Sequence, residues 1–386
     1  MFLVAGTAIG GGMLALPVLT AEGGFWPTTA LYFLSWAFMA ATGHLLMEVA
    51  LFSKEEINIV SMAKKTLGHF GTIFAWVFYL FLFYSLTVAY ISGGGSLIGY
   101  WLNFGKEGLP FWLLSALFII LFAPFVVSGA KTVGKINTLF VWGLLISFLF
   151  FVGMGMPYID FTNLTRFYFP KALIALPVVF TSFSFQGIVP TLINYLGRDA
   201  KKCILAIWLG SFIPLVTYVI WEALILGIVP LHGLQHACAL GETAVYPLKD
   251  FLNRPSLFLV GKFFAFFAIV TSFFGVTLGL TDFLRDGLKI KRSTREKFLL
   301  ALLVFVPPLA IAMSKPCLFL NALHYAGGLG CTLLLGLLPV LMVWRGRYVQ
   351  HHKSVSPLPG GRATLSLLLL FIVCELAITF LTLAHR

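Results

Sequence analysis

The stretch that decides the fold runs from Gly6 to Pro17 and reads GTAIGGGMLALP. It lies in an apolar segment, 1–21, that is long enough to cross a bilayer at about 1.5 Å per residue. Three glycines, Gly10–Gly12, stand in its middle, and glycine holds a helix poorly. In hydrocarbon, unwound backbone is tolerated only where protein or a polar cavity satisfies its polar groups. The stretch therefore predicts a broken membrane helix whose free amides and carbonyls hold a ligand. The alternative is a small-residue face for tight helix packing.

The composition is typical of a polytopic membrane protein. Of the 386 residues, 60% are hydrophobic and 10% are charged, and long apolar runs recur from end to end. Basic cytoplasmic loops account for the net charge of +12, so no nucleic-acid partner is expected. The five cysteines show neither CxxC nor His-linked metal spacing. We therefore expect no cofactor and a single domain embedded in the lipid bilayer.

We expect an all-α protein with eleven membrane spans. They are 1–21, 27–52, 70–102, 110–129, 136–156, 171–196, 203–229, 256–289, 298–313, 317–344 and 364–384. With the N-terminus inside, 18 Lys and Arg residues fall in cytoplasmic segments and 7 in outer segments. This asymmetry predicts a cytoplasmic N-terminus and an external C-terminus.

A second interruption is expected in the sixth span, where LPVVFTSFSFQGIVPTL covers 176–192. Polar and helix-breaking residues crowd this otherwise apolar helix: Ser182, Ser184, Gln186, Gly187 and Pro190. Proline removes one backbone donor and disfavours a helical residue before it. The first and sixth spans correspond if 1–156 and 171–344 form inverted repeats, with 364–384 as an extra helix. Interrupted helices at corresponding positions indicate the binding site of a transporter.

Five segments carry a resemblance to a known family. They are GTAIGGGMLALP (6–17), LFYSLTVAYISGGG (82–95), FTSFSFQG (180–187), IPLVTYVIWE (213–222) and TSFFGVTLGLTDF (271–283). Over nearly its whole length the chain resembles the bacterial aromatic amino acid permeases, the tyrosine- and tryptophan-specific branch of the hydroxy/aromatic amino acid permeases. That family belongs with the amino acid–polyamine–cation transporters, which share the LeuT-type five-plus-five inverted repeat with broken first and sixth helices.

The resemblance implies a function as well as a fold. It implies import of an aromatic amino acid across the bacterial cytoplasmic (inner) membrane, tyrosine first and tryptophan next, by cation-coupled symport with alternating access. A monomer is expected. The alternative within transport is a serine/threonine-type permease of the same fold. We expect no enzyme, because the sequence has no HExxH and no serine-nucleophile motif, and a channel would need a polar-lined pore.

A substrate site is implied by the same resemblance. The substrate carboxylate would lie on the amides of Gly10–Gly12, and its ammonium would face carbonyls around 5–7 and 180–183. The implied substrate-binding residues are Ala5, Gly6, Thr7, Gly10, Gly11, Gly12, Thr87, Tyr90, Phe180, Thr181, Ser182, Phe183 and Gln186. Thr87 and Tyr90 share a helical face, which is as consistent with packing as with a pocket. Gln186 departs from the family, which more often carries histidine there.

The coupling ion is left open by the resemblance. In sodium-coupled relatives a cation lies between the first break and the eighth span, where this sequence has Gly6, Ile9, Ala268, Thr271 and Ser272. Their carbonyl and hydroxyl oxygens are ligands that suit a hard cation. Members of the aromatic branch are usually described as proton-driven, so both H⁺ and Na⁺ remain.

Four ionisable residues lie within spans and away from their ends, where charge is costly: Glu48, Glu222, Lys262 and Glu375. His44 and Glu48 are one helical turn apart, and one interpretation makes them a proton relay or part of a gate. In the alternative, Glu48 is a buried carboxylate that neighbouring hydroxyls satisfy and that locks helices together. Glu222 and Lys262 are expected at similar depth in the outer half and to form an ion pair. Glu375, on the eleventh span, is expected at the periphery or at an interface.

Overall fold

The computed structural model describes residues 1–386 except 54–57, 102–108, 252–253, 290–293, 315–317, 353 and 385–386. All regular secondary structure in this described part is helical. Several residues used in the charge count or as span ends lie outside the described residues: Lys54, Leu102, Lys106, Lys291, Arg292, Lys315, Cys317, Lys353 and Arg386.

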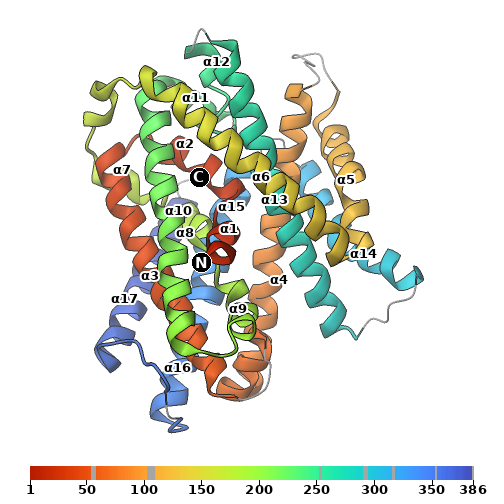
Figure 1. Ribbon diagram of the computed structural model, residues 1–386, viewed down its shortest axis with the longest axis vertical. Coiled ribbons are helices and arrows are strands. Elements are labelled where there is room, and N and C mark those ends of the chain that lie inside the picture. Colours follow the sequence, from red (N-terminus) through yellow and green to blue (C-terminus); the bar gives the residue numbers. More distant parts are fainter. Residues whose placement is uncertain are drawn as a thin grey trace.

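Long helices build the molecule, and several of them follow its long axis in Figure 1. They are α3 (Phe25–Leu51), α4 (Ile59–Trp101), α5 (Phe111–Ser128), α6 (Ala130–Gly155), α10 (Ala200–Ile228), α13 (Pro255–Gly287), α14 (Thr294–Ser314) and α17 (Gly361–Ala384). α6 and α13 run obliquely and pack against each other, and α13 also packs against α4. Their apolar length follows from the runs of Leu, Phe, Val and Ile in the sequence.

Shorter helices form the interrupted spans and the connections. They are α1 (Phe2–Ala8), η1 (Gly11–Leu14), α2 (Leu16–Thr20), η2 (Met156–Tyr158), η3 (Phe161–Thr165), α7 (Phe169–Leu173), α8 (Leu176–Phe183), η4 (Gln186–Ile188), α9 (Val189–Tyr195), α11 (Leu231–Ala239), α12 (Leu248–Phe251), α15 (Phe319–Tyr325), the π-helix η5 (Ala326–Leu337) and α16 (Leu338–Tyr348).

Ten helical segments of the described chain are long and apolar enough to cross a membrane. The first predicted span is not among them, because it is divided into α1, η1 and α2. The sixth is counted as one segment, Leu176–Tyr195, although it contains α8, η4 and α9. The chain is therefore an all-helical, polytopic membrane protein.

The first turns of α4 and the segment that carries α11 and α12 pack onto the helical bundle. α4 bends at Gly68, which has a positive φ of 72°, and its preceding turns bury Ile59 and Met62 against the bundle. The segment that carries α11 and α12 lies against the first span, since the Ala244 amide donates to Leu14 O at 2.9 Å. It thereby contacts η1, the helix that follows the first break.

The π-helix η5 packs closely against the backbone of α8. A Cβ atom added to Gly327 would lie 1.6 Å from Pro177 O of α8, so only glycine permits this approach. The Thr181 hydroxyl of α8 also donates to Leu323 O of α15 at 2.9 Å. α8 is thereby fixed against the helix pair that carries η5.

Candidate functional site

The first predicted span is interrupted beside its glycines. α1 ends at Ala8, and Ile9 and Gly10 have extended backbone, with φ/ψ of −70°/112° and −172°/−155°. The chain resumes as η1 at Gly11 and as α2 at Leu16. The predicted break is confirmed, and it removes backbone amides and carbonyls from the regular helical ladder.

Each of the three glycines contacts a different helix. A Cβ atom added to any of them would lie within 2.8 Å of a side-chain atom from α13, α4 or α8. The pairs are Gly10 with Ser272 Oγ (2.1 Å), Gly11 with Tyr90 Cε1 (2.8 Å) and Gly12 with Ser182 Oγ (2.8 Å). The glycines therefore allow both the unwinding and the close packing that the sequence suggested as alternatives.

Ser272 holds the first break through a direct hydrogen bond. The Gly11 amide donates to Ser272 Oγ at 2.8 Å, and this hydroxyl donates to Ala268 O at 2.8 Å. The adjacent Thr271 hydroxyl donates to its own helix, at Phe267 O, at 2.7 Å. Of the three amides assigned to the substrate carboxylate, that of Gly11 is thus already bonded.

The sixth predicted span is interrupted as well. α8 ends at Phe183, and Ser184 has extended backbone, with φ/ψ of −73°/123°. Phe185 is also non-helical, at −140°/−3°, and α9 begins with Pro190 in its first turn. The second predicted break is confirmed.

Gln186 ties this second break to α3. Its Oε1 accepts from the Phe185 amide at 2.9 Å. Its Nε2 donates to Met39 O at 3.2 Å and to the Thr42 hydroxyl at 3.0 Å, which uses both amide hydrogens. The side chain is fully buried and orders the backbone of the break.

A cavity of about 350 Å³ lies between the two breaks. Small-molecule sites have volumes from about 300 Å³ upward. The implied substrate and cation residues that line it are Gly6, Thr7, Ile9, Gly10, Gly12, Tyr90, Thr181, Ser182, Gln186, Thr271 and Ser272. Those outside the lining are Ala5, Gly11, Thr87, Phe180, Phe183 and Ala268. Two breaks far apart in the sequence thus bound one cavity.

The implied residues outside the lining take part in packing. Phe180 stacks on Phe38 with ring centroids 5.1 Å apart, and Phe183 meets Tyr218 edge-on at 4.9 Å. The Thr87 hydroxyl donates to its own helix at 2.7 Å and is fully buried. These residues support the walls of the cavity from behind.

Two side chains of α10 hold both breaks, and sequence reasoning missed them. The Tyr218 hydroxyl lies 2.7 Å from both Ala8 O and Ser182 O, and with one hydrogen it donates to one carbonyl at a time. Trp221 Nε1 donates to Met13 O at 2.9 Å. The segment 213–222 that carries them was one of the five resembling segments, but nothing in it indicated contact with the breaks.

Asn137 of α6 is a third residue that sequence reasoning missed. It lines the cavity, and its Oδ1 is buried without a hydrogen-bond partner among the described residues. A buried acceptor without a partner is costly unless a ligand supplies a donor. Asn137 is the one amide side chain in the apolar sequence 136–156, and this was the available signal.

His44 and Glu48 have separate partners. The Trp208 indole donates to His44 Nδ1 at 3.4 Å, so His44 Nε2 donates to Ser356 O at 2.9 Å. Glu48 forms a bidentate ion pair with Arg347 of α16, with Nε donating to Oε1 at 2.5 Å. The expectation that hydroxyls satisfy Glu48 is wrong, although the carboxylate does join two helices.

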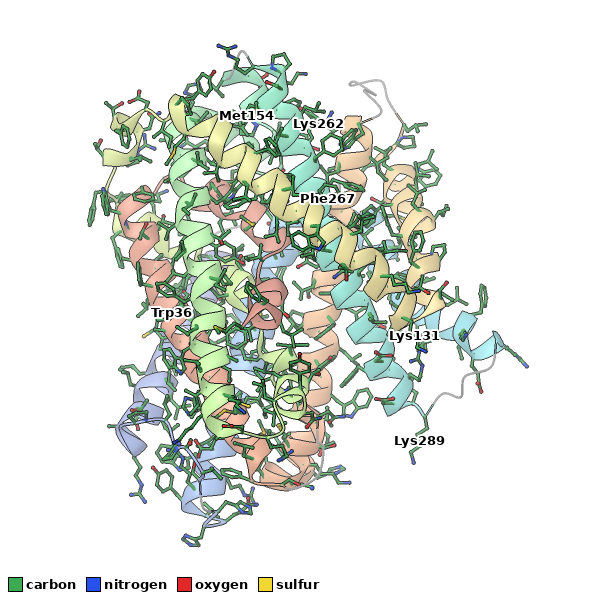
Figure 2. All side chains as sticks on the ribbon, viewed as in Figure 1. Trp36, Lys131, Met154, Lys262, Phe267 and Lys289 are labelled. Atoms are coloured by element: carbon green, nitrogen blue, oxygen red, sulfur yellow. The ribbon has the colours of Figure 1, made fainter. Side chains whose placement is uncertain are left out.

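The predicted ion pair between Glu222 and Lys262 is wrong. Glu222 accepts a hydrogen bond from the Tyr32 hydroxyl at 2.7 Å and also contacts the Thr20 hydroxyl. Lys262 lies over the Trp101 ring, 4.7 Å from its centroid, near the upper end of α13 in Figure 2. Similar depth along two helices does not place their side chains on facing sides.

Glu375 lies in a buried contact between α17 and η5. The Thr332 hydroxyl lies 2.6 Å from its Oε2, and the Thr379 hydroxyl donates to its Oε1 at 3.0 Å. The side chain is fully buried. Its position is therefore at an interface, as one of the two expectations had it, and not at the periphery.

A polytopic helical protein in which two interrupted helices enclose a cavity belongs to the class of membrane transport proteins. The model of the tryptophan/tyrosine permease family matches residues 1–379, and the chain belongs to that family.

Relatives of known name cover nearly the whole chain. A protein named tyrosine-specific transport system 2, from Haemophilus influenzae, is 33% identical over 98% of this chain and 95% of its own length. A tryptophan-specific transport protein of Pseudomonas aeruginosa is 33% identical over 99% and 94%. The low affinity tryptophan permease of Escherichia coli is 29% identical over 96% and 92%.

Proposed function

We propose that the protein is a secondary active transporter that imports an aromatic amino acid, tyrosine foremost and tryptophan next, across the bacterial inner membrane. The observation that carries this proposal is the single cavity bounded by both broken helices. Every amino acid has a carboxylate and an ammonium group. Unwound helix segments offer backbone amides to the first and backbone carbonyls to the second. The names of the relatives support the aromatic class of substrate.

The cavity lining suits a large ring. Aromatic side chains of α4 and of the second break, Tyr79, Phe83, Tyr90 and Phe185, contribute to it. Such rings favour edge-to-face or offset contact with another aromatic group. Three lining glycines, Gly6, Gly187 and Gly275, have no heavy atom within 4 Å of an added Cβ. Each of them leaves space that a side chain would otherwise fill.

Transport follows alternating access in this proposal, with 1–156 and 171–344 acting as inverted repeats and the N-terminus in the cytoplasm. The substrate carboxylate takes the amides of Gly10 and Gly12, because Ser272 already occupies that of Gly11. Import is coupled to H⁺ or Na⁺. A sodium ion would use the oxygens of Gly6, Ile9, Ala268, Thr271 and Ser272; without it, the bond from Gly11 to Ser272 orders the break.

Uptake of labelled tyrosine into proteoliposomes tests the proposal, with proton and sodium gradients imposed separately. We expect accumulation above the external concentration under one gradient, and competition by tyrosine and tryptophan among the twenty amino acids. Competition by serine and threonine instead would favour the other branch of the fold. Tyrosine leak that is independent of both gradients, or chemical conversion of tyrosine, would contradict the proposal of secondary active transport.

A further inference from the structure

Among the described residues, three glutamates are buried within the membrane helices, and they differ in their partners. Glu48 is paired with Arg347. Glu222 and Glu375 each contact two hydroxyl groups, and within the described chain neither forms an ion pair. A buried carboxylate without a cation is costly as an anion, so its neutral acid form is favoured.

The hydrogen bonds of Glu222 indicate where a proton sits. Tyr32 donates to Oε2 at 2.7 Å. Oε1 contacts the Thr20 hydroxyl, which also lies 2.8 Å from Leu16 O, one turn back in α2. The hydroxyl has a single hydrogen and cannot donate to both oxygens. All three contacts are satisfied when Glu222 carries a proton on Oε1 and donates it to Thr20, which in turn donates to Leu16 O.

Loss of that proton changes the bonding of α2. The Oε1–H bond breaks and the proton passes to water. Thr20 then turns its hydrogen from Leu16 O to the carboxylate, which leaves Leu16 O without this bond. Protonation of Glu222 is therefore linked to the hydrogen bonding of the outer half of the first span.

The location of Glu222 connects this change to the candidate substrate site. It lies one turn beyond Tyr218 on α10 and next to Trp221. Those two side chains hold Ala8 O and Met13 O on either side of the first break. One face of α10 thus contacts the first span before the break, after it, and at the outer end of α2.

Other charged groups near α10 are remote or already paired. The helices α1, α2, α8 and η3, which pack against α10, contain no titratable residue. Four titratable residues on other neighbouring elements are exposed: Lys131 and Lys135 of α6, Tyr158 of η2 and Tyr195 of α9. On α3, Glu48 pairs with Arg347 and His44 bonds to Trp208 and Ser356, which leaves Tyr32 as the group that faces Glu222. On α10 itself, Tyr218 is the nearest titratable side chain along the helix.

We propose that Glu222 is a proton-binding site, and that its proton controls the hydrogen bonding of α2 during the transport cycle. This inference rests on the proposed function and names H⁺ as the coupling ion. Proton binding completes the chain from Glu222 to Thr20 to Leu16 O. Proton release keeps the contact between Thr20 and Glu222 but removes the Thr20 hydrogen bond from Leu16 O.

Glu222→Gln tests this inference, with Glu375→Gln as a matched control. Glutamine keeps an oxygen that accepts from Tyr32 and an N–H that donates to Thr20, but it does not titrate. Glu375 has the same arrangement, since one of its oxygens contacts Thr332, whose hydroxyl also reaches Gly327 O. Glu375 hydrogen-bonds to η5 and to its own helix and, among the described residues, not to the first span, so it separates loss of a buried carboxylate from loss of the proposed proton site.

Two measurements on proteoliposomes are needed. Counterflow of labelled tyrosine without an ion gradient reports substrate exchange, and accumulation under an inward proton gradient reports coupling. A gradient of one pH unit supplies about 1.4 kcal/mol per proton. Symport of one proton with each tyrosine can therefore raise the internal tyrosine concentration to about tenfold the external one. We expect Glu222→Gln to exchange tyrosine without accumulating it, and Glu375→Gln to do both.

Several outcomes would overturn the inference. The first is that Glu222→Gln still accumulates tyrosine under a proton gradient. The second is that Glu375→Gln loses proton-driven accumulation while Glu222→Gln keeps it. The third is that the wild-type protein accumulates tyrosine under a sodium gradient only. If Glu222→Gln fails to insert, Tyr32→Phe replaces it. Losing the Tyr32 bond must shift the pH profile of uptake, and an unchanged profile counts against the proton site. Absence of wild-type counterflow with any aromatic amino acid would instead contradict the proposed function.

Discussion

The Gly11 amide and the Ser272 hydroxyl are 261 positions apart in the chain and are joined by a hydrogen bond of 2.8 Å. The amide lies at the start of η1, directly after the extended residues of the break, where no helical carbonyl is available to it. Ser272 supplies the missing acceptor from α13. The eighth predicted span therefore holds the first break in place by a specific contact.

Replacement of Ser272 by alanine is expected to weaken substrate binding. It leaves a buried amide unpaired at a cost of about 1–3 kcal/mol, which corresponds to a rise of about 5-fold to 100-fold in the KM for uptake. The control is Thr271→Val, because Thr271 donates only within its own helix. Equal effects of the two changes on proton-driven uptake would contradict the specific role of Ser272. Selective loss of sodium-driven accumulation in Thr271→Val would favour a cation at this site.

Replacement of Gly11 by alanine or leucine is expected to abolish uptake while the protein still inserts. The new Cβ would lie 2.8 Å from Tyr90 Cε1, and overpacking of this kind costs about 1–3 kcal/mol even for a small group. Gly153→Ala is the control, since its Cβ would meet nothing within 4 Å. Binding of labelled tyrosine to purified protein is the measurement. Wild-type affinity in Gly11→Leu would remove the basis for a substrate site at this break.

The two breaks could be predicted from the sequence because their causes are local. Consecutive glycines and a proline among polar residues weaken the helical backbone locally. They are not sufficient for a break, since Gly93–Gly95 stay helical within α4. The cavity lining was harder to predict, since it depends on which helix face turns inward. Asn137 and Tyr218 lie on spans whose apolar character hides that face.

The partners of the buried charges show the same limit. Depth along a span follows from counting residues, and on that basis Glu222 and Lys262 were paired. Rotation about the helix axis and the packing of neighbours decided otherwise, and Glu222 contacts Thr20 and Tyr32. Arg347 was counted as a cytoplasmic loop residue, yet it belongs to α16 and reaches Glu48.

The ion pair between Glu48 and Arg347 is expected to contribute to stability. Glu48→Gln leaves the largely buried guanidinium unpaired, which costs about 3–5 kcal/mol. Thermal unfolding of the detergent-solubilised protein measures this loss. Glu48→Leu combined with Arg347→Met should recover much of it, because neither charge then remains buried.

Asp282→Asn is the matched control for this pair. The contact of Asp282 with Arg285 is half exposed, so its loss should cost less than about 1 kcal/mol. If His44 and Glu48 act as a proton relay, the expected effect of Glu48→Gln is on transport and not on stability. In that case Glu48→Gln would unfold at the wild-type temperature and lose only proton-driven accumulation.

Asn137 is expected to select substrates by their ring donor. Its Oδ1 lines the cavity and lacks a partner among the described residues. The phenol O–H of tyrosine and the indole N–H of tryptophan each donate a hydrogen bond, whereas the phenylalanine ring has no donor. A site built to bond such a group discriminates against the analogue that lacks it.

Asn137→Leu should therefore weaken the binding of tyrosine and tryptophan but not the binding of phenylalanine. Loss of one hydrogen bond to a buried acceptor is worth about 1–3 kcal/mol, so the inhibition constants of the first two should rise about 5-fold to 100-fold. Competition by each amino acid against labelled tyrosine uptake gives these constants. Asn194→Leu is the control, because Asn194 is exposed on α9 and does not line the cavity. A uniform loss of affinity for all three amino acids would mean that Asn137 shapes the cavity without contacting the ring donor, since only direct contact makes the effect depend on that donor.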